Sequence, residues 1–312
     1  MSSRTQHHGE VSKEGTLLSL PLQSHLDRAL TFCSPITDTQ PEPEPVHTTR
    51  PLSSRADRSQ PDVAECSATD ETSSAPSVYT GVSPENIVIV PLNVEITKEI
   101  DDIVNHILHE YDGRETEENW QRREKCMITL RRLTQGNAPH AFSHEYLAAI
   151  RTLLDCIVIS INSLRTTLSK NTCFFVQDFA KTCGPKADPM VDILLQSLLK
   201  LSATMKRIAA EPGWITVRVL LENVSYSKTI LHHVSTACQG KNSQVRVQAA
   251  KWLRIVIDKQ GRHKSSAENR GGLDVVAACL KSGLEDAHQD VRETSRGSFW
   301  AFYGFAPEKA NE

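Results

Sequence analysis

Two stretches in the second half of the chain open alike and decide the fold class. Asn242-Ser243-Gln244-Val245-Arg246 and His288-Gln289-Asp290-Val291-Arg292 each join a polar turn to Val-Arg, and an apolar helical stripe with a tryptophan follows, Trp252 or Trp300. The two arginines are 46 positions apart, a period typical of stacked helix pairs. Such a stack aligns its turns along one edge, which is a surface for holding a partner rather than a pocket for chemistry.

The same rhythm runs along the chain from about residue 96. Apolar residues recur at intervals of three and four, as in helices that bury one face, and no strand-like alternation competes with them. We expect the second helix of each pair to begin near residues 119, 169, 214, 243 and 288. The sequence therefore predicts an all-α protein, an α-solenoid of about five HEAT-like helix pairs over 93–307, with a tail over 308–312.

Local signals set the expected limits of several helices. Asp112-Gly113 is a plausible end for the first helix, and Pro212-Gly213 indicates a break that places Trp214 in the third turn. Ser243 is a good N-cap, and Asp286 with Gln289 resembles a capping box. One long buried helix is expected over 147–164. No polar capping helix is evident after the fifth pair, so we expect an exposed C-terminal face.

The first 92 residues differ in composition from the rest. They hold 10 of the 15 prolines and carry 12 acidic against 6 basic residues, which leaves 26 acidic and 29 basic residues for 93–312. A segment so poor in aromatic side chains cannot bury enough apolar surface to offset its ordering entropy. We predict that 1–92 is a disordered, acidic Ser/Thr/Pro-rich segment. Its apolar run over 16–22 is too short for a membrane span or a signal peptide, so we expect an intracellular protein with no membrane partner.

Composition also argues against nucleic acid, metal and catalysis. A net charge of +3 over 93–312 is far below the basic footprint that phosphate neutralisation requires. The eight cysteines are scattered without a Cys-x-x-Cys pair, so we expect reduced thiols, those of Cys126, Cys156, Cys173 and Cys183 inside the helical stack. Neither His232-His233 with Cys238 nor Cys126 with His140 and His144 has the spacing of a metal or nucleophile site. We expect no enzyme activity, no catalytic residue and no cofactor.

The predicted turns share an aromatic and basic character. They read Trp120-Gln121-Arg122-Arg123, Ser169-Lys170-Asn171, Gly213-Trp214, Lys241-Asn242-Ser243-Gln244 and Ala287-His288-Gln289. Trp and Arg are the residue types that most often carry interface energy, so this edge suits an acidic protein surface. The alternative, in which Trp120 is packing and the cations are solvated helix ends, stays open at this point.

Several irregular strings carry a resemblance to a known family. They are Gly113-Arg114-Glu115-Thr116-Glu117-Glu118-Asn119-Trp120, then Arg122-Arg123-Glu124, Ser163-Leu164-Arg165-Thr166-Thr167-Leu168-Ser169, Gly271-Gly272-Leu273-Asp274 and Phe299-Trp300-Ala301-Phe302-Tyr303-Gly304. Over about 110–307 the chain resembles a TOG domain of the CLASP (CLIP-associating protein) family, particularly its fungal spindle-stabilising members.

This resemblance implies a non-enzymatic module that engages tubulin through the turns within each helix pair. It implies stabilisation of dynamic microtubules, above all in the mitotic spindle, a location in the cytoplasm, cytoskeleton, spindle and nucleus, and other spindle or plus-end proteins as further partners. Trp120 matches the first-turn aromatic and Arg122 or Arg123 its neighbouring cation, while Lys170, Lys241 and His288 occupy later turns. Trp214 has no assigned contact in the family, and a role as a core or inter-repeat residue stays open.

The chain also departs from the family pattern. CLASP proteins are longer, with additional TOG domains and Ser-x-Ile-Pro motifs, and a TOG domain normally has a sixth repeat. The departure indicates a truncated or fragmentary chain and puts autonomous plus-end tracking in doubt. An alternative function is compatible with the same fold. The protein would then be a HEAT-type adaptor scaffold that binds a protein other than tubulin in its concave face.

Overall fold

The computed structural model describes residues 89–262 and 270–311. The predicted disordered segment 1–92 lies outside these ranges apart from its last four residues, so its disorder stays a prediction. Within the described ranges the regular structure is entirely helical, and no strand is present. The all-α class is therefore confirmed.

Five successive helix pairs make up the described part of the chain, as predicted. Each pair consists of a first helix, a turn and a second helix, and the first member of the second pair is broken into three pieces. The pairs are α2 (Thr97–Glu110) with α3 (Trp120–Gln135); α4 (Ala138–Ala141), α5 (Ser143–Thr152) and α6 (Leu154–Ile161) with α7 (Thr166–Cys183); α8 (Asp188–Ser202) with α9 (Arg207–Asn223); α10 (Lys228–Cys238) with α11 (Ser243–Arg262); and α12 (Arg270–Leu284) with α13 (Gln289–Phe305).

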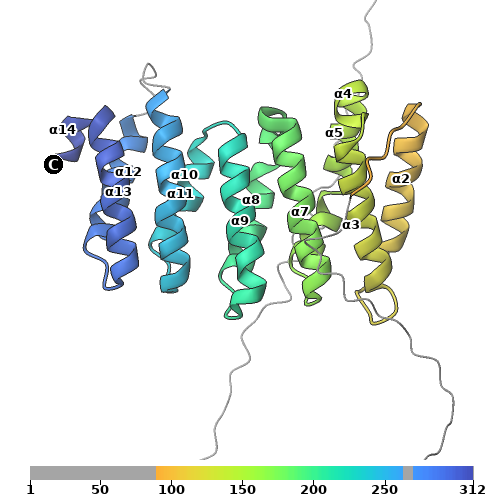
Figure 1. Ribbon diagram of the computed structural model, residues 1–312, viewed down its shortest axis with the longest axis horizontal. Coiled ribbons are helices and arrows are strands. Elements are labelled where there is room, and N and C mark those ends of the chain that lie inside the picture. The colour runs from red at the N-terminus through yellow and green to blue at the C-terminus, as the bar shows by residue number, and fades with distance from the viewer. Residues whose placement is uncertain (1–88, 263–269, 312) are drawn as a thin grey trace, which may run out of the picture. The chain divides into compact units, whose positions relative to one another are not determined.

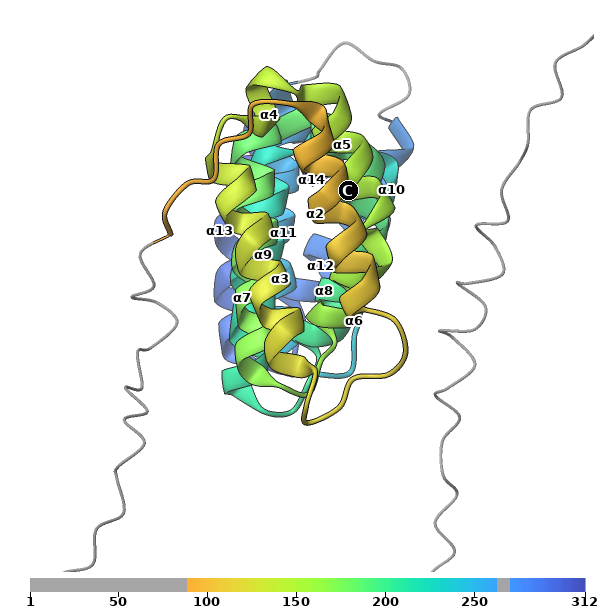
Figure 2. The same cartoon turned by 90° about the vertical axis from the view of Figure 1, so that its right-hand side faces the viewer.

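The pairs stand side by side in chain order, from α2 to α13 (Figure 1). The second helices α3, α7, α9, α11 and α13 form one layer and the first helices form the other, as the view along the stack shows (Figure 2). A short 3-10 helix, η2 (Gly184–Ala187), links the second and third pairs, and α14 (Pro307–Ala310) follows the fifth. The apolar core lies between the two layers and runs through all five pairs.

The helical stripes explain why α11 and α13 pack as they do. In α11, Val245, Ala249 and Trp252 are buried at intervals of four and three, and in α13 Val291, Ser295 and Ser298 repeat those intervals. The two tryptophans, however, differ in their exposure to solvent. Trp252 follows its Val-Arg arginine by six residues and is 1% exposed, whereas Trp300 follows by eight and is 68% exposed. At 100° per residue, two extra positions turn the side chain to the opposite side of the helix.

Two predicted helix starts and one predicted long helix are wrong. The second helix of the second pair begins at Thr166 rather than near 169, and that of the third pair at Arg207 rather than near 214. The expected helix over 147–164 is divided at Leu153, whose backbone (φ −87°, ψ 4°) leaves the helical range. The apolar stripe continues across the break, since Ile150, Leu153 and Ile157 are all buried. The periodicity of apolar residues therefore does not indicate the break at Leu153.

Pro212-Gly213 does not break the chain but lies inside α9. A Cβ on Gly213 would meet the Ser202 hydroxyl oxygen at 3.0 Å, so the glycine allows α9 to approach the end of α8 closely. Trp214 is consequently in the helix and 9% exposed, and its indole Nε1 donates to the Ser202 carbonyl at 3.0 Å. The bond satisfies one of the carbonyls that the end of α8 leaves without a helical partner. The placement of Trp214 in the third turn is therefore wrong, and the alternative, a core residue, is confirmed.

The helix caps also differ in detail from the sequence signals. Asn242, rather than Ser243, precedes α11, and its Oδ1 accepts from the Gln244 backbone N–H at 2.9 Å. At α13 the cap is His288, and Asp286 binds the His288 backbone N–H instead of forming a capping box with Gln289. After the fifth pair a single-turn helix that the sequence did not indicate, α14, packs on α12 and α13. None of its four residues is buried, and the exposed C-terminal face stays a prediction.

A strap formed by residues 89–96 crosses the C-terminal end of α3 on its way to α2. The Leu92 backbone N–H donates to the Arg132 carbonyl at 2.9 Å, and the Asn137 side chain binds both the N–H and the carbonyl of Val94 at 2.8 Å. A Cβ on Gly136 would lie 1.9 Å from the Leu92 carbonyl oxygen, so only glycine permits this approach.

The predicted interior thiols are confirmed. Cys126, Cys156, Cys173 and Cys183 are buried and free. Burial raises the pKa of the Cys126, Cys156 and Cys183 thiols to about 11 and that of Cys173 to about 12. These thiols are therefore poor nucleophiles at neutral pH, in keeping with a structural role.

The contrast between the two tryptophans gives a stability test. We expect Trp252→Ala to lower the free energy of unfolding by about 3–5 kcal/mol, because it removes a large buried side chain and leaves a cavity. Trp300→Ala, the matched control, removes an exposed indole and should change it by less than about 0.5 kcal/mol. Urea unfolding followed by circular dichroism measures both, and equal losses would contradict the packing described for α11 and α13.

Candidate functional site

The five turns within the helix pairs lie along one edge of the stack. We number them turn 1 (111–119), turn 2 (162–165), turn 3 (203–206), turn 4 (239–242) and turn 5 (285–288). All of them face the lower edge in Figure 1, while the links between successive pairs lie at the upper edge. The single-sided arrangement predicted from the sequence period is therefore present in the fold.

Trp120 is the first residue of α3 and stands next to turn 1, with its side chain half-buried. The Arg165 guanidinium from turn 2 lies 5.9 Å from the centre of its ring, and Arg165 also pairs with Glu117 of turn 1. A cation over an indole face is attractive and holds the ring in a fixed orientation. Trp120 is thus neither deep in the core nor fully solvated, and it is presented by residues from two turns.

The two predicted arginines beside Trp120 have different roles. Arg122 is exposed, and its Nε donates to a Glu110 carboxylate oxygen at 2.7 Å, a bond that holds the pKa of Glu110 below its ordinary value. Arg123 is 1% exposed, and its guanidinium donates to the carbonyls of Glu110 at 3.1 Å and Gly113 at 3.0 Å. A direct partner contact by Arg123 is therefore incompatible with its burial, and the side chain instead supports turn 1 from within.

Turn 1 is further fixed by its own side chains. The Thr116 backbone N–H donates to Asn119 Oδ1, and Asn119 Nδ2 donates to the Arg114 carbonyl, both at 2.8 Å. Gly113 has φ +76°, a conformation that favours glycine. Because these bonds are made within the free domain, little conformational freedom of the turn remains to be lost when a partner binds.

The predicted second turn, Ser169-Lys170-Asn171, belongs to the first turns of α7 instead. Ser169 and Asn171 are buried, and their side chains bind the Ile161 carbonyl at 2.8 Å and Glu124 at 2.7 Å. Lys170 is half-exposed, and its Nζ lies 5.7 Å from the centre of the Phe174 ring. Lys170 therefore borders the edge from the helix rather than from the turn.

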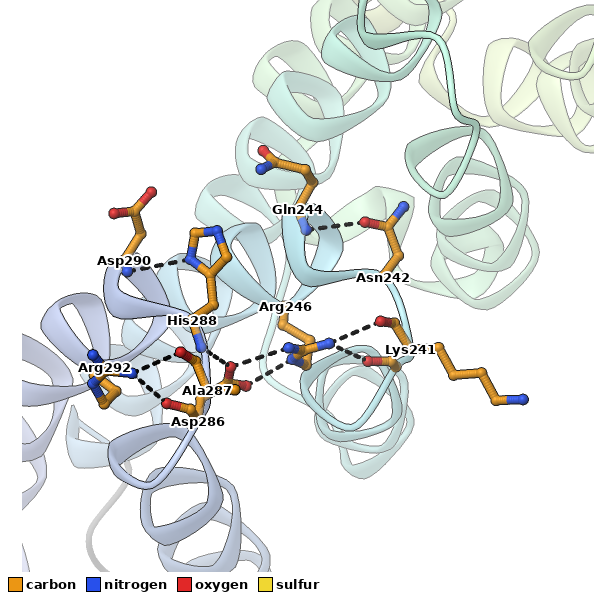
Figure 3. A network of polar contacts seen from close by, with 10 residues as sticks. Lys241, Asn242, Gln244, Arg246, Asp286, Ala287, His288, Asp290 and Arg292 are labelled. Carbon is orange, nitrogen blue, oxygen red and sulfur yellow. Dashed lines mark hydrogen bonds and ion pairs between the residues drawn. The ribbon is translucent and has the colours of Figure 1, made fainter.

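Lys241 and His288 occupy turns 4 and 5 as predicted. The Lys241 side chain is exposed and points away from the polar network around it (Figure 3). His288 is half-buried, and its Nδ1 accepts from the Asp290 backbone N–H at 3.3 Å, so the ring serves as the cap of α13. Of these two residues, Lys241 is the one whose charged atom faces solvent.

The arginine of the repeated Val-Arg motif hydrogen-bonds the backbone of its own turn. Arg246 Nη1 donates to the carbonyls of Gly240 and Lys241 at 3.0 and 2.9 Å, closing turn 4 on itself. Arg292 does the same in turn 5, to the carbonyls of Asp286 and Ala287 at 2.7 and 2.9 Å. In both repeats, therefore, the arginine of the Val-Arg pair hydrogen-bonds two backbone carbonyls of the turn that precedes its helix, and so stabilises that turn (Figure 3).

Arg246 also connects its own turn to the next one. Its Nε and Nη2 donate to the two Asp286 carboxylate oxygens at 2.7 and 3.0 Å, a bidentate pair between turns 4 and 5. Both side chains of the pair are largely shielded from solvent. The Arg246 guanidinium lowers the pKa of Asp286 below its ordinary value. Turns 4 and 5 are therefore held at a fixed spacing.

This arrangement is that of a helical-repeat binding protein with a pre-formed edge. The chain belongs to the CLASP N-terminal family, whose family model (CLASP N terminal) matches residues 100–312. Protein STU1 of Coccidioides immitis is 51% identical over 223 residues, which cover 72% of this chain and 18% of that protein. Protein stu1 of Aspergillus oryzae is 43% identical over 272 residues, covering 86% and 23%. The chain thus spans about a fifth of the length of these relatives.

Among solved structures, the CEP104 TOG domain matches with a TM-score of 0.45 and 9% identity, over 70% of this chain and 89% of that domain. The family assignment therefore depends on the sequence relatives, which agree with the resemblance drawn from the strings in turns 1 and 2 and in α12 and α13.

The link between turns 4 and 5 gives a test of the edge's rigidity. We expect Arg246→Ala and Asp286→Asn each to lower the free energy of unfolding by about 1–3 kcal/mol, because each leaves a shielded charged hydrogen bond unmade. In a double-mutant cycle the second substitution should cost much less than the first. Lys251→Ala, an exposed cation on α11, is the control and should be close to neutral.

The same pair predicts a pH dependence. Since the pKa of Asp286 is lowered in the folded protein, its contribution is complete above the ordinary aspartate value of about 4 and is lost as pH falls through the lower folded value. The stability difference between wild type and Asp286→Asn should therefore be full at pH 7 and shrink below about pH 4. A difference that grows on acidification would contradict the pairing.

Proposed function

We propose that this domain binds tubulin through the edge formed by turns 1 to 5 and thereby stabilises dynamic microtubules, including those of the mitotic spindle. Membership of the CLASP N-terminal family supports a microtubule-associated role. The resemblance of turn 1 to a TOG domain supports tubulin as the partner. The geometry supports an edge contact, because all five turns lie on one side of the stack. The exposed cations Arg122, Lys206 and Lys241 lie in these turns or at their ends.

The observation that carries the proposal is the presentation of Trp120. A half-buried indole at the start of α3, oriented by Arg165 of the next turn, has the properties of an interface anchor. Its ring is already ordered, so binding would cost little side-chain entropy. In this proposal Trp120 has both of the roles that the sequence left open, since its half-buried side chain packs in part and stays accessible in part.

Energetic reasoning supports an affinity of moderate strength. A well-buried tryptophan contributes on the order of 2 kcal/mol or more to an interface. Exposed cations such as Arg122 and Lys241 contribute about 0.2–1 kcal/mol each and are screened by salt. One anchor with several weak charges corresponds to binding in the micromolar class.

We also propose a non-enzymatic role in the cytoplasm, on the cytoskeleton and spindle and in the nucleus, with other spindle or plus-end proteins as further partners. Among the described residues, no group of three or more His, Cys, Asp or Glu side chains could hold a metal ion. Within those same residues, no helix combines the length and apolarity needed to cross a bilayer. Imaging of a fluorescent fusion through the cell cycle tests the location.

The anchor is tested by Trp120→Ala. We expect the variant to bind tubulin about 30-fold more weakly than wild type, the equivalent of about 2 kcal/mol. Co-elution with tubulin on a sizing column and co-pelleting with microtubules give the measurement. Trp300→Ala is the matched control, since it removes an exposed indole from α13 outside the five turns. Wild-type binding by Trp120→Ala would remove the anchor, and no binding by the wild type would favour the adaptor alternative.

The cationic part of the edge is tested by ionic strength. We expect the affinity of the wild type for tubulin to fall as salt is raised from about 0.05 to 0.2 M, because the Debye length shortens to below 10 Å over this range. Lys241→Ala should bind more weakly at low salt and show a shallower salt dependence. An affinity that is independent of salt would contradict an electrostatic contribution.

A further inference from the structure

The most exposed large apolar side chains of the described residues gather in two adjacent turns. Leu164 of turn 2 is 94% exposed, Met205 of turn 3 is 100% exposed and Ile208 in the first turn of α9 is 83% exposed. Single exposed apolar residues are normal on any protein surface. Here, however, the three highest values occur together on the edge that carries Trp120, and we name these three residues the apolar strip.

Turns 2 and 3 are neighbours because α7 and α9 pack directly against each other. Gln177 of α7 donates to the Thr216 hydroxyl of α9 at 2.9 Å, and both turns lie at the same edge in Figure 1. The strip therefore continues along the edge from the Trp120 region, which Arg165 already ties to turn 2.

The backbone of each turn fixes the outward direction of the strip. Ser163 and Arg165, on either side of Leu164, are both bound to turn 1, through Glu115 at 2.9 Å and through Glu117. With its neighbours held inward, Leu164 is left facing solvent. In turn 3 the Thr204 hydroxyl donates to the Leu201 carbonyl at 2.8 Å, which closes the turn at the residue before Met205. The exposure is thus built into hydrogen-bonded turns.

Turns 2 and 3 themselves contain basic but no acidic residues. The sequence contains no acidic residue over 162–177 or 193–210, the ranges that include both turns. Lys200, Lys206 and Arg207 are exposed there. Turn 1 differs, since Asp112, Glu115, Glu117 and Glu118 lie in it. Because Glu115 and Glu117 reach turn 2, the basic side chains border the strip at turn 3. A partner that fits the strip there should present apolar surface bordered by carboxylates.

We propose that the apolar strip is a second anchor of the edge, which buries Leu164, Met205 and Ile208 against an apolar ridge of tubulin whose flanking carboxylates pair with Lys206 and Arg207. The inference depends on the function proposed above and adds to it the chemistry of the contact. Flexible Met and Leu side chains adapt well to a partner surface. Burial of the three apolar side chains contributes an affinity that does not depend on salt. Lys206 and Arg207 orient the partner and raise the rate of association.

The test compares Leu164→Ser, Met205→Ser/Ile208→Ser and the triple variant with wild type by calorimetric titration against tubulin. Because the three side chains are exposed in the free domain, the substitutions should leave its melting temperature within about 2 °C. We expect the triple variant to bind at least about ten-fold more weakly and its binding heat-capacity change to be less negative, since less apolar surface is buried. Lys206→Ala should instead reduce the salt dependence and leave the heat-capacity change unaltered.

Val275→Ser is the matched control, because Val275 is an exposed apolar residue of α12 outside the turns. If wild type and Val275→Ser bind, Trp120→Ala is weakened and the strip variants bind as wild type, the strip is not an anchor and the proposed function stands. An equal loss in Val275→Ser would also overturn the inference, because the effect would not be specific to the strip. If wild type does not bind tubulin at all, the proposed function fails and the strip proposal fails with it.

Discussion

Contacts between successive second helices hold the whole edge in line. Arg131 of α3 pairs with Asp178 of α7 at 3.0 Å, and Arg254 of α11 donates to the Gly297 carbonyl of α13 at 2.9 Å. Each such bond joins one pair to the next and sets how far one helix is displaced along its neighbour. A solenoid has contacts only between adjacent repeats, so these local bonds are what keeps distant turns on a common line. The hydrophobic core supplies the stability, and the polar bonds set the register.

Much of this fold could be predicted because the pattern of each helix is local. The starts of α3, α11 and α13 came within one residue of the expected positions, since turns rich in polar residues precede each of them. The errors arose where tertiary packing overrides a local signal. Pro212-Gly213 is a strong break signal by itself, and only the close approach of α8 to Gly213 shows that α9 continues through it. Leu153 divides a stripe that remains apolar on both sides, so the sequence has no mark there.

The candidate site was predictable in outline and less so in detail. Trp120, Arg122 and Lys241 reach the edge because they are close to turns that the sequence identifies. The burial of Arg123 could not be foreseen, since its partners are backbone carbonyls of turn 1. The contact of Arg165 with Trp120 could not be predicted, because it joins residues 45 positions apart in sequence. Exposed apolar residues in turns are likewise invisible to a periodicity argument, which assigns every Leu, Met and Ile to the interior.

The strap over α3 determines the side from which the preceding chain is attached. Val94 and Leu92 are bound at the C-terminal end of α3, while turn 1 lies at its N-terminal end. The point of entry into the domain and the row of turns are therefore separated by the full length of a helix, about 24 Å for sixteen residues. The junction with the preceding chain is therefore not itself in the path of a partner that approaches the row of turns.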